Sequence, residues 1–321
     1  MNKIQSIIRT MLPVASLAAV LSACEHKELC FDHTHLISVE VEFDWSLAPE
    51  ADPASMAAYF FSDKGDEERF VFTDNRGGRI MIPFGNYNGI GTNNDNTDWA
   101  GLRNESDIET IETYTAGTEV LAGNGFETYS LPRARGAEDE HFISSPGMMW
   151  SARTDNIRLQ ITDTLGHVVF TPSEAICHYK VIINDVENLK YLHGSAIDAT
   201  LTGMSEGFLH GSQQATDTHA TLPFTLAADP DSPNTLETSF LTFGESPAQH
   251  YPHYLTVYLR LTDGTKWYST FDVTRQIQTA EDPHNVTIVV SGLKLPSPIL
   301  HDEGLHPDVN DWQTIEVDLD M

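Results

Sequence analysis

The 321-residue chain carries 47 acidic against 18 basic residues, a formal net charge of −29, with 40% hydrophobic and 9% aromatic residues. This apolar content is enough to build packed cores and excludes a disordered chain. A surface this acidic repels nucleic acid, so a nucleic-acid-binding role is excluded as well. The length leaves room for two ordinary domains.

The chain begins with the features of a bacterial export signal. Lys3 and Arg9 precede an uncharged apolar run over residues 11–23. That run is too short to span a membrane, which needs about 20 apolar residues. It ends in the tetrapeptide LSAC, a lipobox in which the thiol of Cys24 takes a diacylglycerol and the signal is cut off before it. The alternative is an ordinary secretory signal with a chance cysteine, but the order of the three parts predicts a signal peptide over residues 1–23 and a lipid-anchored chain from Cys24.

Most of the remaining chain alternates between apolar and polar side chains. Residues 37–45 (ISVEVEFDW) do so without a break, which is the pattern of a half-buried strand. Turn-forming clusters such as DKGDEE and DNRGG separate the runs that follow. Shorter strands are predicted over residues 57–61, 69–73, 79–83, 86–92 and 108–114.

The second half repeats this pattern. Its clearest element is a hairpin over residues 254–273, in which Asp263 and Gly264 are expected to supply the two positive-φ positions of a tight turn. Further strands are predicted over residues 176–184, 221–227, 236–243 and 285–291. No segment shows a sustained helical stripe, so the sequence predicts an all-β protein with little helix.

Interruptions of the pattern predict the domain organisation. A linker over residues 24–36 is expected to precede an N-terminal β-sandwich over residues 37–168 and a C-terminal β-sandwich over residues 169–321. Within the second domain, residues 292–312 are rich in Pro and Gly and should form an extended arm. Residues 313–321 (QTIEVDLDM) alternate again and predict a terminal strand, which either stays on its own sheet or pairs with another chain.

The cysteines and histidines offer two weak candidate sites. Export favours disulfides, so Cys30 and Cys177 are a candidate pair, although sequence alone leaves the pairing open. Cys30, His33 and His35 lie close together and could ligate zinc or copper. No second Cys or His pair completes such a site in the sequence, so we expect a polar lead-in to the first strand, without metal or other cofactor.

No catalytic motif stands out. None of the Cys/His signatures of thiol enzymes fits the sequence. Glycosidase carboxylates have no local signature, so a hydrolase stays open as the third reading. A glycan-binding surface protein is the second, with Trp99, Trp150, Tyr251 and Tyr254 as candidate contacts, although such side chains more often pack in cores.

Several segments in order resemble the Bacteroidetes fimbrillin-like lipoproteins, the type V pilin and Mfa-like group. They are CFDHTHLISVEVEFDWSLAP after the lipobox, IPFGNYNGIGTNND, LPRARG, LTVYLRLTDGTKWYSTFDVT, and HPDVNDWQTIEVDLDM at the end. The resemblance covers nearly the whole chain after Cys24. It implies two transthyretin-like β-sandwich domains, a lipoprotein of the outer membrane or cell surface, and a structural, anchoring or adhesive role in fimbriae rather than an enzymatic one. The implied partners are other fimbrial subunits and a glycan or protein of a host or bacterial surface.

In that group, proteolysis after a basic residue releases the first strand, and a strand of the next subunit takes its place by β-strand addition. This chain departs from the pattern, because no Lys or Arg lies between Lys27 and Lys64. Cleavage at the next candidates, Lys64 or Arg69, would also remove the second predicted strand. Arg133 and Arg135 are further candidate processing sites. The departure favours a subunit that keeps its lipid, such as an anchor, an accessory component or a terminal adhesin.

Overall fold

The computed structural model describes residues 35–96, 98–161, 165–194, 196–229, 232–247, 251–298 and 311–315. The chain divides after Leu36, and the architecture below is that of the second part. In the described part, helix is limited to α2 (Thr274–Gln278) and the 3-10 turns η1 (Trp45–Leu47), η2 (Thr128–Ser130) and η3 (Leu189–Tyr191). None of these helices is long or apolar enough to cross a membrane. The all-β prediction is confirmed.

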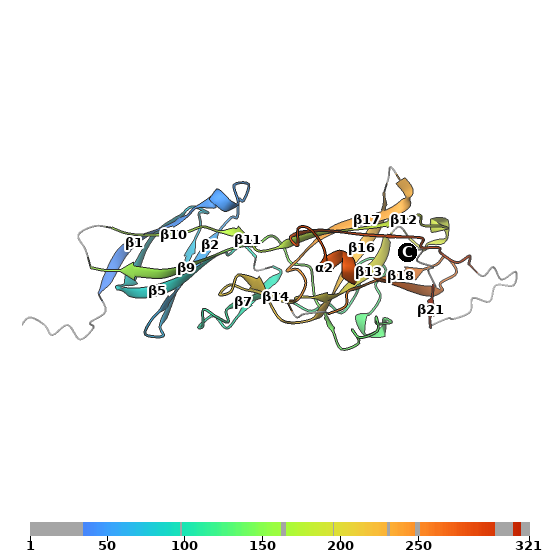
Figure 1. Ribbon diagram of the computed structural model, residues 1–321, viewed down its shortest axis with the longest axis horizontal. Helices are drawn as coiled ribbons and strands as arrows, with labels where there is room; N and C mark the ends of the chain where they lie inside the picture. The colour runs from blue at the N-terminus through green and yellow to red at the C-terminus, as the bar shows by residue number, and fades with distance from the viewer. Residues whose placement is uncertain are drawn as a thin grey trace, which may run out of the picture. The chain divides into compact units, whose positions relative to one another are not determined.

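The first β-sandwich packs a three-stranded sheet, in the order β10-β1-β4, against a five-stranded sheet, in the order β11-β9-β5-β2-β3 (Figure 1). Its strands are β1 (Leu36–Phe43), β2 (Met56–Ser62), β3 (Glu67–Phe72), β4 (Gly77–Pro83), β5 (Gly85–Asn93), β9 (Trp150–Leu159), β10 (Gly166–Phe170) and β11 (Ser173–Glu174).

Strand β1 is the central strand of the smaller sheet. It runs parallel to β10, with Val39 opposite Gly166 and Phe43 opposite Phe170. Its alternating apolar side chains are buried and pack against Phe60 of β2 and its neighbours in the opposite sheet. The alternation in the sequence therefore places one face of β1 in the core.

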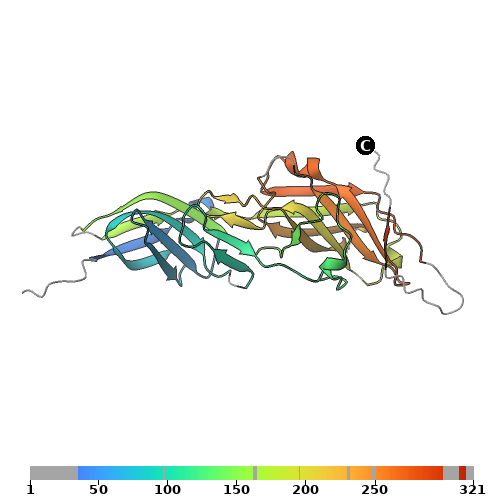
Figure 2. The ribbon, with the colours of Figure 1, turned by 90° about the horizontal axis from the view of Figure 1, so that it is seen from below.

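The second β-sandwich is built from a nine-stranded sheet (Figure 2). Eight strands follow the order β20-β12-β17-β16-β13-β18-β19-β21, and β8 pairs with β16. Their bounds are β8 (His141–Phe142), β12 (Cys177–Asn184), β13 (Ala196–Met204), β16 (Ala220–Asp229), β17 (Ser232–Thr242), β18 (Tyr254–Arg260), β19 (Lys266–Asp272), β20 (Asn285–Ser291) and β21 (Trp312–Thr314). Apolar side chains from both halves of this sheet belong to one buried cluster, so the sheet closes over a single core.

A small sheet in the order β15-β14-β7-β6 joins segments from both halves of the chain. It comprises β6 (Ala100–Arg103), β7 (Glu112–Thr115), β14 (Gly207–Leu209) and β15 (Gln214–Ala215). Beside it, the buried ring of His210 lies between two hydroxyl groups, with Thr113 Oγ1 2.8 Å from Nε2 and Ser151 Oγ 2.8 Å from Nδ1.

The predicted strands of both halves are present in the described part of the chain, with two differences from expectation. Residues 299–310 of the predicted arm and residues 316–321 of the predicted terminal strand lie outside the described residues. In the 254–273 hairpin, only Gly264 has positive φ, at 86°, and Asp263 does not. The Gly264 N–H bonds to Leu261 O and the Leu261 N–H bonds to Thr265 O, so the turn is longer than two residues and needs one left-handed position. The strand expected over residues 108–114 starts only at Glu112, because residues 107–111 form turns held by Asp107.

The sequence pattern missed the longer strands β9, β10 and β13 and the short strands β6, β8, β11, β14 and β15. Strand β9 (WSARTDNIRL) alternates poorly because it contains a residue with positive φ, Asn156, where the register against β5 shifts. Strand β10 spans residue 168, at which the two domains were expected to divide, and it pairs along its length with β1. We therefore propose a boundary after Phe170.

Candidate functional site

The last described segment of the chain is a short strand at one end of the nine-stranded sheet. Strand β21 runs parallel to β19 over three residue pairs, from Trp312 opposite Lys266 to Thr314 opposite Tyr268. The Ile315 N–H donates to Tyr268 O at 2.8 Å, and the Ser269 hydroxyl donates to Ile315 O at 3.2 Å. Within residues 311–315, few backbone hydrogen bonds hold this strand, and parallel pairing is the weaker kind per residue.

Side-chain contacts of Trp312 and Ile315 supply the rest of the attachment. The Trp312 ring packs edge-on against Phe126, with centroids 4.8 Å apart, and against Tyr258, at 5.4 Å. Its Nε1–H donates to Ser130 O at 3.1 Å, and Lys266 Nζ lies 5.9 Å above the ring. Ile315 is 9% exposed and belongs to the main core of the second sandwich. Trp312 and Ile315 therefore contact opposite faces of the sheet.

The wall around Trp312 comes from residues 116–140, which we call the covering segment, between β7 and β8. It crosses the outer face of β13 and β18 and contributes Leu121, Phe126 and Leu131 to a separate apolar cluster with Tyr258. Asp198 of β13 secures it, because its buried carboxylate accepts hydrogen bonds from Gly123 N, at 2.7 Å, and from Asn124 N, at 2.8 Å. The covering segment is therefore attached to β13 by contacts that do not involve the terminal strand.

Tyr258 links this wall to the sheet. Its hydroxyl donates to Pro132 O at 2.8 Å, and burial raises the pKa of the phenol to about 12. The phenol therefore stays protonated at all ordinary pH values and keeps its donor role.

Arg133 and Glu140 fasten the C-terminal end of the covering segment to its neighbours. The Arg133 guanidinium lies 4.0 Å above the Phe142 ring and donates to Glu140 O at 2.6 Å. Burial lowers the pKa of Arg133. The Glu140 carboxylate is itself buried and accepts hydrogen bonds from Gly203 N and from the Thr221 hydroxyl. These contacts of Arg133 and Glu140, which we call the Arg133 clamp, attach the end of the covering segment to β8, β13 and β16.

The four candidate processing residues lie in different surroundings. Lys64 is exposed in the turn between β2 and β3, and Arg69 on β3 donates to Tyr59 OH at 2.8 Å and to Asn94 Oδ1 at 2.7 Å. Arg133 is half-buried in its clamp, whereas Arg135 is exposed beside Gly136, which has a φ of 87°. Processing at any of them stays a prediction.

The predicted cysteine and metal sites lie mostly outside the described residues. Cys24, Cys30 and His33 belong there, so lipidation, the Cys30–Cys177 pair and the metal candidate stay predictions. His35 is exposed just before β1. Cys177 is buried, with its Sγ 3.7 Å from His284 Nδ1, and burial raises the pKa of its thiol to about 12. Among the described residues, no group of three or more His, Cys, Asp or Glu side chains could hold a metal ion.

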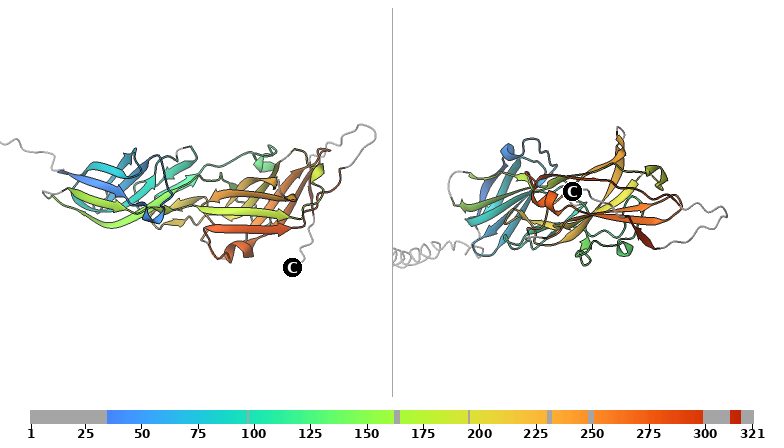
Figure 3. Two further views of the ribbon diagram at one scale, coloured as in Figure 1. Left: turned by 90° about the horizontal axis from the view of Figure 1, so that it is seen from above. Right: turned by 45° about the vertical axis from the view of Figure 1, so that its right-hand side comes forward.

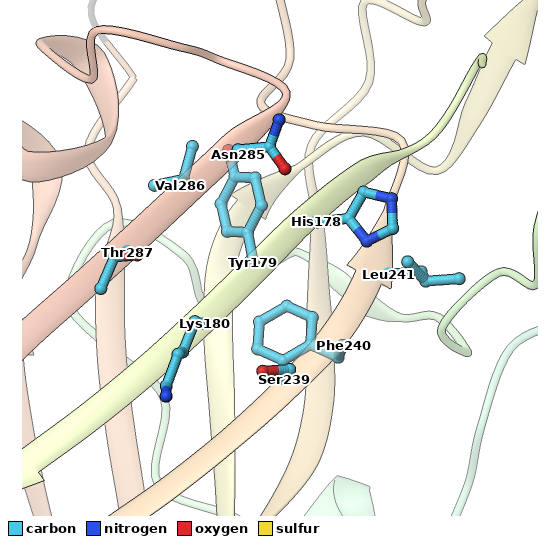
Figure 4. A pocket seen from close by; sticks show the side chains of 9 residues that line it. All are labelled: His178, Tyr179, Lys180, Ser239, Phe240, Leu241, Asn285, Val286 and Thr287. Atoms are coloured by element: carbon cyan, nitrogen blue, oxygen red, sulfur yellow. The ribbon is translucent and has the colours of Figure 1, made fainter. Parts of the chain in front are cut away.

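A shallow hollow lies on the β20-β12-β17 part of the sheet (Figure 4). His178, Lys180 and Thr287 are among its lining residues, and Lys180 Nζ is paired with Glu237 Oε2 at 2.8 Å. None of the nine lining residues is a carboxylate, and its aromatic residues are buried Tyr179 and half-buried Phe240, which stacks on Phe224. The hollow therefore offers neither the paired carboxylates of a glycosidase nor an open aromatic platform.

The candidate glycan-binding aromatics are used in packing. Trp150 meets Trp45 edge to face at 6.1 Å, and Tyr251 stacks on His219 at 3.6 Å. Trp99 packs against the buried cluster around Met149. These contacts do not bring the predicted residues together in one platform.

Sequence reasoning missed Trp312, Phe126 and Asp198 as parts of one site. Trp312 immediately precedes the alternating run that predicted the terminal strand, so its position was the available signal. Nothing local marks Phe126 or Asp198, because their roles depend on contacts between distant segments.

Comparison with known proteins identifies a family and a relative of this chain. Residues 23–225 match the family described as "Domain of unknown function (DUF5119)". Over 201 residues the chain is 21% identical to a protein of Bacteroides ovatus named "Putative fimbrium anchoring subunit Fim4B", a match of 62% of this chain and 55% of that protein. The chain thus spans about half the length of this relative.

Among solved structures, the fold is similar to that of a "putative adhesin" from Bacteroides ovatus. The TM-score is 0.61 at 19% identity, over 86% of this chain and 99% of the other. The fimbrial anchor protein Mfa2 from Porphyromonas gingivalis gives a TM-score of 0.49 at 13% identity, over 80% of this chain and 90% of the other. The chain belongs to the DUF5119 family and to the Bacteroidetes fimbrillin-like group.

Proposed function

We propose that this protein is a lipid-anchored component of a surface fimbria that keeps its own first strand and joins its partner subunits through its terminal strand. The role is structural or adhesive rather than catalytic. It corresponds most closely to an anchor, the function for which the Bacteroides ovatus relative is named.

The observation that carries the proposal is the way β21 is held. Among the described residues, three parallel residue pairs with β19 and the side chains of Trp312 and Ile315 attach it to the end of the sheet. If β21 leaves, the edge of β19 and the aromatic wall around Phe126 become available together. Such an edge binds an extended segment of another chain through backbone hydrogen bonds, and the wall selects a large side chain.

The position of β1 supports the proposal that the protein keeps its lipid-carrying N-terminal segment. Val39, Val41 and Phe43 are buried between the two sheets, and the chain between β1 and β2 contains no basic residue at which a trypsin-like protease could cut. A cut at Lys64 would separate β1 and β2 together. Strand β2 is interior to the five-stranded sheet, so losing both strands would remove a large part of the core.

Lipidation supplies the membrane attachment. We propose that Cys24 carries the lipid and that the protein is held at the outer membrane or cell surface. A Cys24→Ser variant should lose labelling by radioactive palmitate, and undiminished labelling would contradict the assignment.

Assembly is tested in cells with three versions of the chain: the natural one, one that ends after residue 310, and a Trp312→Ala variant. The proposal expects both altered proteins to be lipidated and folded but absent from purified surface fibres. A matched control is Trp267→Phe, which changes a tryptophan of β19 that packs against the main core instead. Normal incorporation of the shortened chain would end the proposal. Degradation of the shortened chain would instead show that β21 is a permanent strand.

A further inference from the structure

Two turns and the start of β1 lie at the same end of the first sandwich. In the parallel pair, Val39 near the start of β1 is opposite Gly166 at the start of β10. Leu159 at the end of β9 is opposite Gly85 at the start of β5. The β4–β5 turn at Phe84 and the β9–β10 turn therefore both lie where the chain enters the domain, and in Figure 3 the blue strand β1 runs beside the yellow-green strands β9 and β10.

These turns carry large apolar side chains on the outside. Phe84 is 40% exposed, Ile161 62% and Leu165 46%. Single exposed apolar residues are ordinary, but here three sit on two turns at one end of a very acidic protein. We call Phe84, Ile161 and Leu165 the apolar end.

The opposite end of the same strands is engaged in protein contacts. There Ser151 of β9 bonds to His210, and Arg153 donates to Gly211 O at 2.5 Å. The apolar end is thus the end of β9 away from the second-half segments that β9 contacts.

We infer that the apolar end rests in the interface of the lipid bilayer to which Cys24 is tethered; this inference rests on the proposed lipidation. Eleven residues separate Cys24 from Leu36. Even fully extended they span roughly 40 Å at 3.3–3.6 Å per residue, so the tether keeps the start of β1 near the membrane. At the resulting high local concentration, three weakly inserting side chains are enough to orient the domain.

The negative charge of the protein determines which kind of lipid headgroup this end can contact. The net charge of −29 opposes contact with anionic headgroups. At the same end, exposed Asp63 and Asp66 flank Lys64, so the local charges give no net attraction. The contact is therefore apolar, favours a zwitterionic surface and withstands salt.

The test replaces the natural lipid with an artificial tether. The chain from residue 24, with Cys24→Ser and Cys30→Ser, carries an N-terminal hexahistidine tag and is attached to phosphatidylcholine vesicles that contain a nickel-chelating lipid. A polarity-sensitive NBD label is placed at Leu165→Cys. The matched control is Leu47→Cys, which replaces a leucine that is 65% exposed just beyond the other end of β1. Cys177 is buried in both proteins.

On tethering, the label at position 165 should shift to shorter wavelength and be quenched by doxyl-labelled phosphatidylcholine, in 0.5 M salt as well as at low salt. The label at position 47 should do neither. Replacing Ile161 by Ser should reduce the quenching at position 165 severalfold while the melting temperature stays unchanged, because the side chain of Ile161 is 62% exposed. Equal behaviour at the two positions, or loss of the signal in salt, would overturn the inference. Because the tag bypasses lipidation, a failure of palmitate labelling at Cys24 would be recognised separately.

Discussion

The indole ring of Trp312 lies edge-on to the phenyl ring of Phe126, with centroids 4.8 Å apart and planes at 65°. One residue belongs to the end of the chain and the other to the covering segment, which is fastened to the sheet by Asp198 and Tyr258. The wall that holds the terminal strand thus has attachments to the sheet of its own. We therefore expect that the strand can leave without unfolding the domain.

Replacing Trp312 by Ala should release β21 and leave the rest of the domain folded. Loss of the ring contacts weakens attachment of the strand by about 1–3 kcal/mol, below the cost for a fully buried Trp because Trp312 is half-buried. Hydrogen–deuterium exchange should rise at residues 311–315 and in β19, with little change in the main core. A Trp312→Phe variant keeps an aromatic ring but loses the bond to Ser130 O. Its exchange at residues 311–315 should lie between those of the natural protein and the Trp312→Ala variant. A global loss of protection would contradict the independent wall.

Brief trypsin digestion of the folded protein should cut after Arg135 and spare Arg133. Arg135 is exposed in a turn, whereas the guanidinium of Arg133 is held over Phe142 and bonded to Glu140 O. Mass spectrometry of the fragments identifies the cut, and Arg135→Gln should abolish it. Equal cleavage after the two arginines would show that the clamp opens readily.

The stability of the protein should fall as the pH drops from about 6.5 to 4, in part through His210. Burial lowers the pKa of this imidazole from 6.5 to about 4. Between those values the unfolded chain binds a proton that the folded chain does not, so acid favours unfolding; above pH 6.5 the contribution is constant. Because one pKa unit corresponds to 1.36 kcal/mol, the full effect is about 3 kcal/mol.

Urea unfolding at pH 7 and pH 4.5 measures this dependence. A His210→Gln variant should show a smaller difference between the two pH values than the natural protein. The same slope in the His210 variant would assign the acid sensitivity to other groups.

Gly77 is the position at which β1 and β4 approach most closely. It has a φ of 103°, and a Cβ there would lie 2.2 Å from Val41 O. A Gly77→Ala variant should therefore be destabilised by about 3 kcal/mol or more, because strand pairing and backbone conformation both suffer. Gly65 has a φ of 91° with nothing within 4 Å of its Cβ position, so Gly65→Ala should cost only about 1 kcal/mol. Thermal unfolding compares the two, and similar melting temperatures would refute the role of Gly77.

The sequence by itself determined the fold class and most strands, because alternation has a physical cause that acts locally. In β20 every second side chain is buried, and in β1 Val39, Val41 and Phe43 are, as the alternation in the sequence predicts. Strand β9 was missed because the shift at Asn156 breaks the period, and the longer 254–273 turn was missed because one left-handed residue suffices where two were expected.

Tertiary structure alone decided which distant segments meet. The pairing of β1 with β10 places residues 166–170 in the first sandwich, although turn signals in the sequence placed the boundary within them. The contact of Trp312 with Phe126 and the anchoring of the covering segment by Asp198 likewise join segments that share no local pattern. Alternation specifies which face of a strand is buried, but the partner of that face is fixed by how the whole chain packs into a common core, and this information is not contained in any single segment.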